Sequence, residues 1–391
     1  MLATTVALAL VAIVPDPSGS WRGVLDLAGG PLRFEVAIAR EAGGLRAELC
    51  NAGECAPAGP VRLIGDSLVI DLTDYAATIA ARVSGDSLVG AYSNVGNRGP
   101  RLIPFRAARG RWKATALPAA FAGQWDATLV TDGRASPRIF VFSEGRRGAE
   151  GAVISNTGDY GRFHGMVAGD SVAFSHFDGS FVYMFTARLD GDTLRGTFHA
   201  GLRTQTPFTA VRSTGRAHLK APTEMTTADT IEPFRFAFPD LDGRLVAHDD
   251  PQFRGRVVVV DVFGTWCSTC HYAAPILESF QREYGPRGFT VVGLAYEVTG
   301  DTAVDGVLVR RYREKFGLTF PLLLAGMGTA ELAAPTLPQL NGFTAFPTTI
   351  FLGRDGRVRR VHAGFYGPAT GAMHRQQVTE FRAVIESLLR E

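Results

Sequence analysis

A pair of cysteines separated by two residues stands between an apolar run and a helix start, and this junction constrains the fold more than any other feature. Residues 257–263 read Val-Val-Val-Val-Asp-Val-Phe, an apolar run of strand length, and Cys267 and Cys270 follow it. The residues after Cys270 have the pattern of a helix start. A sulfur at a helix N-terminus meets free backbone N–H groups and the positive end of the helix dipole, which favour a thiolate. The junction therefore predicts a redox-active dithiol, and half of a zinc site is the alternative for the same spacing.

The residues around this junction alternate between strand and helix patterns. The expected strands are 257–262, 289–296, 348–352 and 358–363, and the expected helices are 269–284, 304–316 and 376–390. Parallel strands that cross over through helices, followed by an antiparallel hairpin, predict a mixed α/β sheet for residues 231–391.

The N-terminal half of the chain repeats itself at an offset of about 104 residues. Trp21 recurs as Trp125, and Gly-Asp turns and a Pro-Phe pair recur in the same order. Apolar and polar residues alternate within each copy, for example at 32–38, which is typical of short antiparallel strands between tight turns. We therefore expect two β-rich repeats, at 20–110 and 120–214, each closed as a barrel or folded as a sandwich.

The polar residues of these repeats predict no chemistry of their own. The Gly-Asp pairs place Asp66, Asp86, Asp170 and Asp192 where tight turns need them, so we interpret them as turn residues. The histidines His164, His176 and His199 are scattered over different expected strands and receive no role. A packed apolar interior is expected in preference to a ligand cavity. Residues 215–230 lose all periodicity and are interpreted as a linker.

The N-terminal residues 1–19 are expected to be a signal peptide or a retained apolar segment. Residues 5–14 have the length of a signal-peptide apolar core, although no Lys or Arg precedes them. The rest of the chain has no apolar run of membrane-spanning length. With 20% charged residues and a formal net charge of +2, the composition gives no reason to expect nucleic-acid binding.

Cys50 and Cys55 form the second cysteine pair and enclose a turn-forming tetrapeptide, Asn-Ala-Gly-Glu. In an exported protein, such a pair is expected to form a structural disulfide at the tip of a hairpin. Two unrelated thiols, or a second redox pair, are the alternatives. The wider loop and the lack of a strand-to-helix junction disfavour a second redox pair.

Residues 233–391 resemble the TlpA-like branch of the thioredoxin superfamily, whose members are exported thiol-disulfide oxidoreductases. The run 255–267 resembles the central strand and active-site approach of that branch, and 238–244 resembles its entry hairpin. Pro275 stands where thioredoxins place the proline of the active-site helix, and the segment 346–349 resembles their cis-proline loop. The full prediction is two tandem all-β antiparallel repeats, barrels or sandwiches, followed by an α/β thioredoxin-like domain.

The chemistry of the dithiol assigns one role to each sulfur. Cys267, exposed by the turn, is expected to attack a substrate disulfide as a thiolate, and the more buried Cys270 resolves the mixed disulfide. Asp261 interrupts the apolar strand, and burial should raise the pKa of its carboxyl so that it can hold or relay a proton. Its position resembles that of the buried acid of thioredoxins. A strand-end Asp bonded to backbone is the alternative. Thr269 departs from the Pro that family members often have there, which leaves the reduction potential open.

Trp266, Phe346 and Pro347 are expected to bind the substrate. Pro347 resembles the family's cis-proline, which would leave the backbone of Phe346 free to pair with an extended substrate segment. Trp266 is expected to pack over the dithiol and line the substrate surface, or else to be a core tryptophan. Glu297 is expected to be a solvated carboxylate, with a catalytic role as the alternative, and His271 is expected to be a solvated residue of the first helical turn. No second Cys-x-x-Cys or His pair completes a zinc site with Cys267 and Cys270, so no metal is expected.

The predicted function is therefore an exported thiol-disulfide oxidoreductase that needs no cofactor beyond its own redox-active disulfide. The expected partners are a disulfide-bearing protein substrate and a membrane-side thiol redox partner, and the expected location is the periplasm or another extracytoplasmic space. Reduction is the favoured direction. One alternative is oxidation or isomerisation with the same dithiol. The other is a non-enzymatic binding protein that binds through its β repeats and has the dithiol as a redox sensor.

Overall fold

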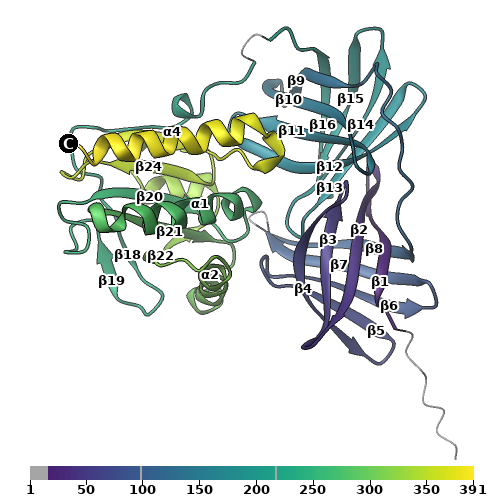
Figure 1. Cartoon of the computed structure of the whole chain (residues 1–391), viewed down its shortest axis with the longest axis horizontal. Helices are drawn as coiled ribbons and strands as arrows, with labels where there is room; N and C mark the ends of the chain where they lie inside the picture. The colour runs from purple at the N-terminus through teal and green to yellow at the C-terminus, as the bar shows by residue number, and fades with distance from the viewer. Residues whose placement is uncertain (1–15, 97–98, 216–217) are drawn as a thin grey trace, which may run out of the picture.

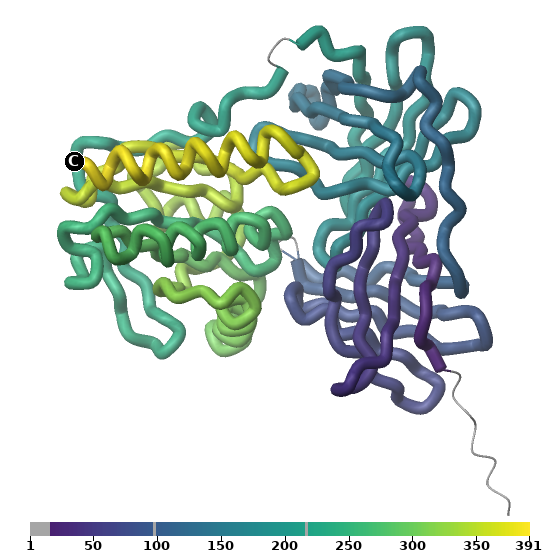
Figure 2. Tube along the Cα trace, viewed as in Figure 1, coloured from purple at the N-terminus to yellow at the C-terminus, as the bar shows by residue number. Residues whose placement is uncertain are grey.

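The protein consists of two β-barrels and a mixed α/β domain, as seen in a computed structural model that describes residues 16–96, 99–215 and 218–391 (Figure 1). The predicted signal segment at 5–14 lies outside the described residues. The α/β domain occupies one side of the molecule, and the two barrels stand one above the other on the opposite side (Figures 1 and 2). The predicted fold class is confirmed, and the repeats are barrels, not sandwiches.

The first barrel is a closed meander in which each strand pairs antiparallel with the next and β1 pairs with β8. Closure leaves no open sheet edge. Its strands are β1 (Gly19–Leu27), β2 (Gly30–Glu41), β3 (Gly44–Asn51), β4 (Glu54–Ile64), β5 (Ser67–Leu72), β6 (Ala77–Ser84), β7 (Ser87–Gly96) and β8 (Gly99–Arg109).

The second barrel has the same strand order and closes through β9 and β16. Its interior is rich in phenylalanine, with stacked rings such as Phe174 and Phe185 at 5.2 Å between centroids. Its strands are β9 (Gly123–Thr131), β10 (Arg134–Gly145), β11 (Gly148–Ser155), β12 (Gly158–Ala168), β13 (Ser171–Phe177), β14 (Val182–Asp190), β15 (Thr193–Ala200) and β16 (Thr204–Arg212).

The recurring tryptophans occupy the same place in the two barrels. Trp21 and Trp125 are fully buried in the first strand of each, and each indole N–H donates to the carbonyl four residues upstream at 2.8 Å. The guanidinium groups of Arg109 and Arg212, from the last strand of each barrel, lie over these rings at 4.4 and 4.2 Å. A cation over the face of an indole is attracted by the ring quadrupole. Each tryptophan therefore joins the first and last strands, where the barrel closes.

The two barrels are joined end to end by the β13–β14 hairpin of the second. Phe177 is fully buried in the core of the first barrel, 4.7 Å from the ring of Phe34 and 5.0 Å from that of Tyr92. The side-chain amide of Asn51 donates to the carbonyl of Phe177 at 2.9 Å and accepts from its N–H at 3.1 Å. Tyr92 donates its hydroxyl to the carbonyl of Gly179 at 2.9 Å. This hairpin therefore closes one end of the first barrel and satisfies its own backbone there.

The α/β domain is built on a five-stranded sheet in the order β22-β21-β20-β24-β25. The first three strands are parallel, and β24 and β25 form the antiparallel hairpin. The sheet strands are β20 (Val257–Phe263), β21 (Phe289–Glu297), β22 (Leu322–Met327), β24 (Thr348–Leu352) and β25 (Val358–Ala363). Every residue of β20, β21 and β24 is buried, as expected for central strands covered on both faces.

Helices cover both faces of this sheet, three on one face and one short helix on the other. The helices are α1 (Ser268–Tyr284), α2 (Thr302–Phe316), α3 (Ala330–Ala333) and α4 (Ala372–Leu388), with short 3₁₀ turns η1 (Pro222–Glu224), η2 (Gly285–Arg287), η3 (Ala334–Thr336) and η4 (Pro368–Thr370). Side chains of α1, α2 and α4 share one core with Val257, Val259 and Phe263, and the alternate residues of β20 face a second core that includes α3.

Two strand pairings in this domain were not predicted. β22 is a sheet strand in a region where no element was expected. Two-residue strands β17 (Thr227–Ala228) and β23 (Leu340–Asn341) form a small sheet, which attaches the end of the expected linker to the α/β domain. β22 and the strands of this small sheet are too short or too irregular to show a two-residue period. The strands β18 (Ala237–Pro239) and β19 (Leu245–Ala247) form the entry hairpin that the resemblance of 238–244 led us to expect.

The α/β domain docks on the second barrel through closely packed backbone. Phe365 donates its N–H to the carbonyl of Thr157 at 3.2 Å, and Gly367 donates to the carboxylate of Asp159 at 2.5 Å. Gly364, at φ 87°, lies so close that an added Cβ would stand 1.9 Å from the Thr157 carbonyl oxygen. Only glycine permits this approach.

Truncating Phe177 is expected to destabilise the paired barrels. Phe177→Ala removes a fully buried ring from the end of the first barrel, and Phe-to-Ala changes in cores cost about 3–5 kcal/mol. Guanidinium denaturation of the full chain measures this loss. Leu102→Ala, at a side chain that is 66% exposed on the first barrel, is the control and should change stability by less than about 0.5 kcal/mol. Equal effects for the two variants would contradict the role of Phe177 as a joint.

Candidate active site

The two cysteines lie where β20 passes into α1. Cys267 is the N-cap residue of α1, and Cys270 lies in its first turn with its N–H bonded to the Cys267 carbonyl at 3.0 Å. Both are free thiols. Cys270 is fully buried, as expected, but Cys267 is only 2% exposed, so the expectation that the turn leaves it exposed is wrong. The cis-proline loop and the second barrel cover Cys267.

Asp261 lies beneath the helix that carries the dithiol. It faces the same core as Val257, Val259 and Phe263, which is the core that contains Cys270. Burial raises the pKa of its carboxyl to about 7. Burial, a hydrogen bond with Cys267 and the charge of Asp261 together raise the pKa of the Cys270 thiol well above its usual value. The carboxyl and the resolving thiol therefore share one low-dielectric environment and disfavour each other's ionisation.

Asp261 belongs to a polar row that crosses the sheet. Thr349 is its partner in the register of β24, and His362 is the partner of Thr349 in β25. Paired residues of antiparallel strands point to the same face. Within the described residues, Oδ1 of Asp261 and Oγ1 of Thr349 have no hydrogen-bond partner, so the alternative of a strand-end Asp bonded to backbone is not supported for this oxygen.

The expectation that Glu297 is solvated is wrong. Glu297 ends β21 and is only 2% exposed. Its buried carboxyl accepts two hydrogen bonds from the loop before the dithiol. The Thr265 N–H donates to Oε1 at 2.8 Å, and the Thr265 hydroxyl donates to Oε2 at 2.6 Å. Burial raises the pKa of the Glu297 carboxyl to about 8. Glu297 therefore holds Thr265, two residues before Cys267, in place.

The expectation that His271 is solvated is also wrong. His271 is buried, and its Nε2 lies 2.8 Å from the carbonyl oxygen of Thr265. Its ring packs 4.8 Å from Tyr75 of the first barrel and 5.1 Å from Tyr312 of α2. Burial lowers the pKa of His271 to about 4, so the imidazole is neutral at neutral pH and donates from Nε2. Pattern alone cannot reveal this burial, because the ring is covered by a barrel distant in sequence.

Trp266, Phe346 and Pro347 gather around Cys267. The Phe346–Pro347 peptide bond is cis, and the Cys267 sulfur lies 3.5 Å from the Phe346 carbonyl oxygen. The rings of Trp266 and Phe346 meet edge to face at 5.4 Å, and the indole N–H donates to the Tyr296 carbonyl at 2.8 Å. Trp266 is half-buried and anchored at its nitrogen, so one edge of its ring is left to line a cleft.

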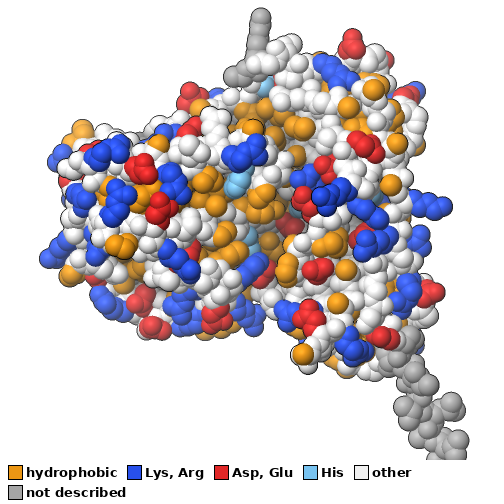
Figure 3. Space-filling view, viewed as in Figure 1, with side chains coloured by type: hydrophobic (Ala, Val, Ile, Leu, Met, Phe, Trp, Pro, Cys, Tyr) orange, Lys and Arg blue, Asp and Glu red, His pale blue; other side chains and the backbone are white. Residues whose placement is uncertain are grey.

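The cleft at Cys267 has one wall from each half of the protein and a volume of about 400 Å³. The α/β domain contributes Trp266, Cys267 and Phe346. The wall contributed by the second barrel consists of Ser155, Thr157, Gly158, Asp159, Tyr160, Phe181 and Tyr183. Figure 3 shows apolar side chains and histidines gathered along the boundary between the α/β domain and the barrels. Sequence reasoning missed the barrel wall, since no motif links β12 and β14 to the dithiol.

Corresponding turns of the two barrels reach the active site. Tyr75, in the β5–β6 turn, stacks on His271, and the neighbouring Asp74 forms an ion pair with Lys315 of α2. In the β13–β14 turn, the Ser180 hydroxyl donates to the Trp266 carbonyl at 2.6 Å. Both barrels therefore contact the dithiol segment directly.

The cysteines of the first barrel form a disulfide far along the chain from the dithiol. Cys50 and Cys55 face each other across the β3–β4 hairpin with their Cα atoms 4.0 Å apart. Among residues 16–96, 99–215 and 218–391, no group of three or more His, Cys, Asp or Glu side chains is arranged to hold a metal ion. Over the same residues, no helix is long and apolar enough to cross a membrane.

Comparison with known proteins places the C-terminal domain in a family. The Redoxin family matches residues 226–371. The curated relatives include the thiol-disulfide oxidoreductase ResA of Halalkalibacterium halodurans, 25% identical over 39% of this chain and 73% of that protein. ResA of Geobacillus thermodenitrificans is 29% identical over 33% of this chain and 66% of its own length. The C-terminal domain is a TlpA-like domain of the thioredoxin superfamily.

Solved structures are also similar to this TlpA-like domain. A thiol:disulfide interchange protein of the thioredoxin family from Chlorobium tepidum is 22% identical, with a TM-score of 0.32, over 42% of this chain and 99% of its own. A DsbF homologue from Corynebacterium diphtheriae is 18% identical, with the same TM-score, over 45% of this chain and 97% of its own. The curated relatives confirm the predicted enzyme class, a thiol-disulfide oxidoreductase.

The buried carboxyl of Asp261 should make the protein less stable as the pH rises. Its pKa of about 7 in the folded state exceeds the model-peptide value of 3.8, so the folded state binds the proton more tightly. The free energy of unfolding should therefore fall between pH 4 and 7, by about 1.4 kcal/mol for each unit of pKa difference. In Asp261→Asn, which cannot ionise, this decline should shrink. Denaturation at several pH values under reducing conditions measures it.

The pH range of the decline and a control variant distinguish the effect of Asp261 from that of Glu297. Glu297, whose pKa is raised from 4.5 to about 8, should cause a decline of similar size that remains in the Asp261→Asn variant and extends to that pH. Asp192→Asn, at an exposed turn, is the control and should follow the parent profile. The assignment is contradicted if Asp261→Asn and the parent have the same profile.

Proposed function

We propose that this protein is an exported thiol-disulfide oxidoreductase that reduces disulfides of partner proteins through Cys267 and Cys270. The observation that carries the proposal is the arrangement of the dithiol. Cys267 caps α1 and lines a cleft beside the cis-proline loop, while Cys270 is buried above Asp261. One cysteine that borders a cleft and a second that does not line it suit attack by the first and resolution by the second.

The proposed reaction balances two electrons and two protons. The Cys267 thiolate attacks one sulfur of the substrate disulfide, forming a mixed disulfide and releasing the other substrate sulfur, which takes up a proton. The Cys270 thiol loses its proton to Asp261 and attacks the Cys267 sulfur. The second substrate sulfur leaves and takes up a proton from solvent as Asp261 releases the one that it accepted, and the enzyme is left with a Cys267–Cys270 disulfide. The proton taken up by the first substrate sulfur corresponds to the one that Cys267 lost on ionising. An external dithiol donor, the proposed membrane-side partner, then returns two electrons and two protons.

The surroundings of the cleft support distinct roles for the other predicted residues. The backbone at Phe346 and Pro347 would align an extended substrate segment beside the Cys267 sulfur. Trp266 would cover that segment with the free edge of its ring. Asp261, whose burial raises its pKa to about 7, is suited to accept a proton near neutral pH.

Export is part of the proposal and has two supports. The apolar residues at 5–14 have the length of a signal core. The Cys50–Cys55 disulfide belongs to an oxidising compartment such as the periplasm, because cytosolic thiols are kept reduced. We further propose residues 20–110 and 120–214 as two copies of one β unit and 231–391 as the catalytic domain.

Substitution of the two cysteines tests the mechanism. Cys267→Ser should abolish disulfide reduction, since no other sulfur lines the cleft in the described part of the chain. Cys270→Ser should accumulate a mixed disulfide visible on a non-reducing gel. The double variant Cys50→Ala, Cys55→Ala is the control and should keep its activity. Full activity in both single variants, with no trapped substrate, would show that the dithiol is not the catalyst and would favour a binding protein.

The reduction potential tests the direction. A reductase should have a Cys267/Cys270 potential near about −270 mV, whereas an oxidase should lie near about −120 mV. Equilibration of the full chain with dithiol buffers of known potential, read by thiol alkylation and mass spectrometry, gives the value. The Cys50–Cys55 pair does not obscure the reading, because mass spectrometry assigns the alkylated peptides of the two pairs separately. A potential near the oxidase value would overturn the reductase direction.

A further inference from the structure

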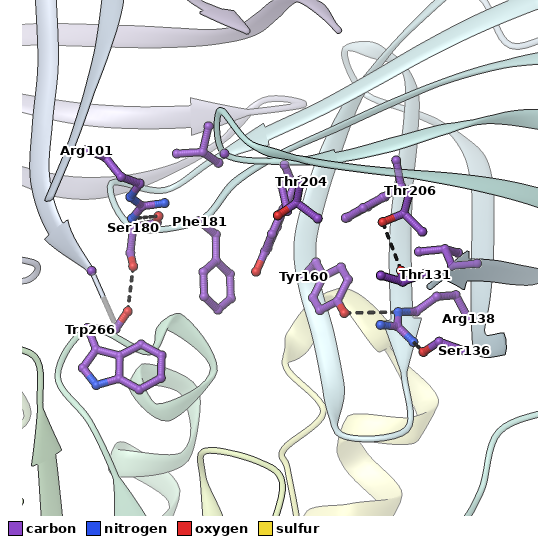
Figure 4. A pocket seen from close by; sticks show the side chains of 17 residues that line it. Arg101, Thr131, Ser136, Arg138, Tyr160, Ser180, Phe181, Thr204, Thr206 and Trp266 are labelled. Carbon is purple, nitrogen blue, oxygen red and sulfur yellow. Dashed lines mark hydrogen bonds between the residues drawn. The ribbon is translucent and has the colours of Figure 1, made fainter. Parts of the chain in front are cut away.

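The mouth of the second barrel contains a cavity of about 420 Å³ next to the dithiol cleft (Figure 4). The expectation of a merely packed barrel interior is therefore incomplete at this end. A volume in the range of small-ligand sites, about 300–1,000 Å³, holds a small molecule or a few residues of an extended peptide. A folded domain is too large to enter.

The cavity is positively charged. Among the described residues that line it, Arg101 and Arg138 are the charged side chains, and none is Asp or Glu. Arg101 donates to the side chain of Asn94 at 2.7 Å and to the carbonyl of Ser180 at 3.0 Å. Arg138 donates to the Tyr160 hydroxyl at 3.1 Å and to neutral oxygens of Ser136 and Pro137. All these acceptors are neutral, so neither guanidinium has a carboxylate among its hydrogen-bond partners in the described part of the chain.

The rest of the lining combines aromatic rings with hydroxyl groups. Tyr160, Tyr183 and Phe198 form a cluster with ring centroids 4.8 to 5.8 Å apart. The hydroxyls belong to Thr131, Ser136, Thr204 and Thr206. Arginine forms charge-assisted hydrogen bonds with carboxylates, and aromatic walls exclude water and strengthen them. The lining therefore suits an anionic group on a partly apolar ligand.

The cavity and the dithiol cleft are parts of one surface. Tyr160, Phe181, Tyr183 and Trp266 line both. Figure 4 shows Trp266 and Arg101 on one side of the cavity, Phe181 and Tyr160 in the middle, and Arg138 on the far side. Ser180 links the two regions, because its carbonyl accepts from Arg101 and its hydroxyl donates to the Trp266 carbonyl. A ligand held in the cavity can therefore extend past Trp266 to Cys267.

We propose that the mouth of the second barrel is the substrate-binding subsite of this oxidoreductase and selects peptide disulfides with carboxylates next to the cysteine. This inference rests on the proposed function and adds the substrate class. Arg101 would hold the carboxylate nearer the disulfide and Arg138 the one farther away. The acidic segment can belong to a free peptide or to an extended part of a protein, since both offer the same chemistry.

A matched pair of peptide disulfides tests the proposal with the full-length chain. The symmetrical disulfide of the blocked tripeptide Glu-Glu-Cys is compared with that of blocked Gln-Gln-Cys, which differs only in charge. Each rate is divided by the rate with a small dithiol reductant, which removes the intrinsic difference in reactivity. We expect kcat/KM to favour the acidic peptide by at least about tenfold at low salt, and the preference to shrink as salt screens the charges.

Variants of the cavity locate the preference. Arg138→Gln, and separately Arg101→Gln, should bring the acidic-to-neutral ratio of kcat/KM close to one. Arg195→Gln, an exposed arginine of β15 outside the cavity, is the matched control and should keep the parent ratio. Arg138 is the more informative site, because Arg101 also ties the first barrel to the β13–β14 turn of the second.

The outcomes separate this inference from the proposed function. Equal corrected rates for acidic and neutral segments, both as free peptides and within an unfolded protein, would overturn the subsite and leave the oxidoreductase intact. Failure to reduce either peptide, or a disulfide-bonded protein such as insulin, would overturn the proposed function itself. A preference that appears only when the acidic segment is part of an unfolded protein would identify proteins, not free peptides, as the source.

Discussion

The arrangement of the two barrels and the α/β domain depends on the short turn Asp178–Phe181 between β13 and β14. The Asp178 carboxylate accepts the N–H groups of Ser180 at 2.9 Å and Phe181 at 2.7 Å, which fixes the turn from inside. Burial opposes this charge, but the adjacent His176 and the hydrogen bonds more than offset it, so the pKa of Asp178 is lowered. An ionised carboxylate that accepts backbone N–H groups holds a loop more firmly than a neutral side chain can.

From this turn, contacts lead in three directions. Phe177, just before it, fills the end of the first barrel, and Ser180 bonds to the backbone of Trp266 beside the dithiol. Phe181 lines both the dithiol cleft and the cavity in the barrel mouth. Because the turn Asp178–Phe181 makes all these contacts, the barrels form part of the active site and are not a separate module. The same contacts explain why Cys267 is covered in a domain whose sequence predicts an exposed sulfur.

The electrostatics of the dithiol follow from burial. Asp261 and Glu297 have raised pKa values and His271 a lowered one, in each case chiefly because burial penalises the charged form. These three side chains are therefore mostly uncharged between about pH 4 and pH 7. By contrast, the cavity in the barrel mouth retains two charged guanidinium groups. One region is suited to proton transfer and the other to recognition of an anion.

Much of this protein follows from local sequence patterns. The Cys-x-x-Cys between strand and helix, the period of two in the barrels, and the recurrence of Trp21 as Trp125 depend on neighbours within a few residues or on one offset. The predicted helices and strands of the α/β domain consequently lie within a few residues of α1, α2, α4 and the strands β20, β21, β24 and β25. β22 was missed, because it has no dithiol, turn or alternation to mark it.

The sequence by itself determined the dithiol, the enzyme class and the two-part architecture, because each is encoded in contiguous residues. Only the tertiary structure decided what surrounds the dithiol. His271 and Glu297 are buried by partners far away in the chain, and the wall at Tyr160 and Phe181 comes from a barrel about 100 residues upstream. The packing of separate domains depends on surface shape and on individual close approaches such as Gly364 against Thr157, and neither leaves a periodic signal in the sequence.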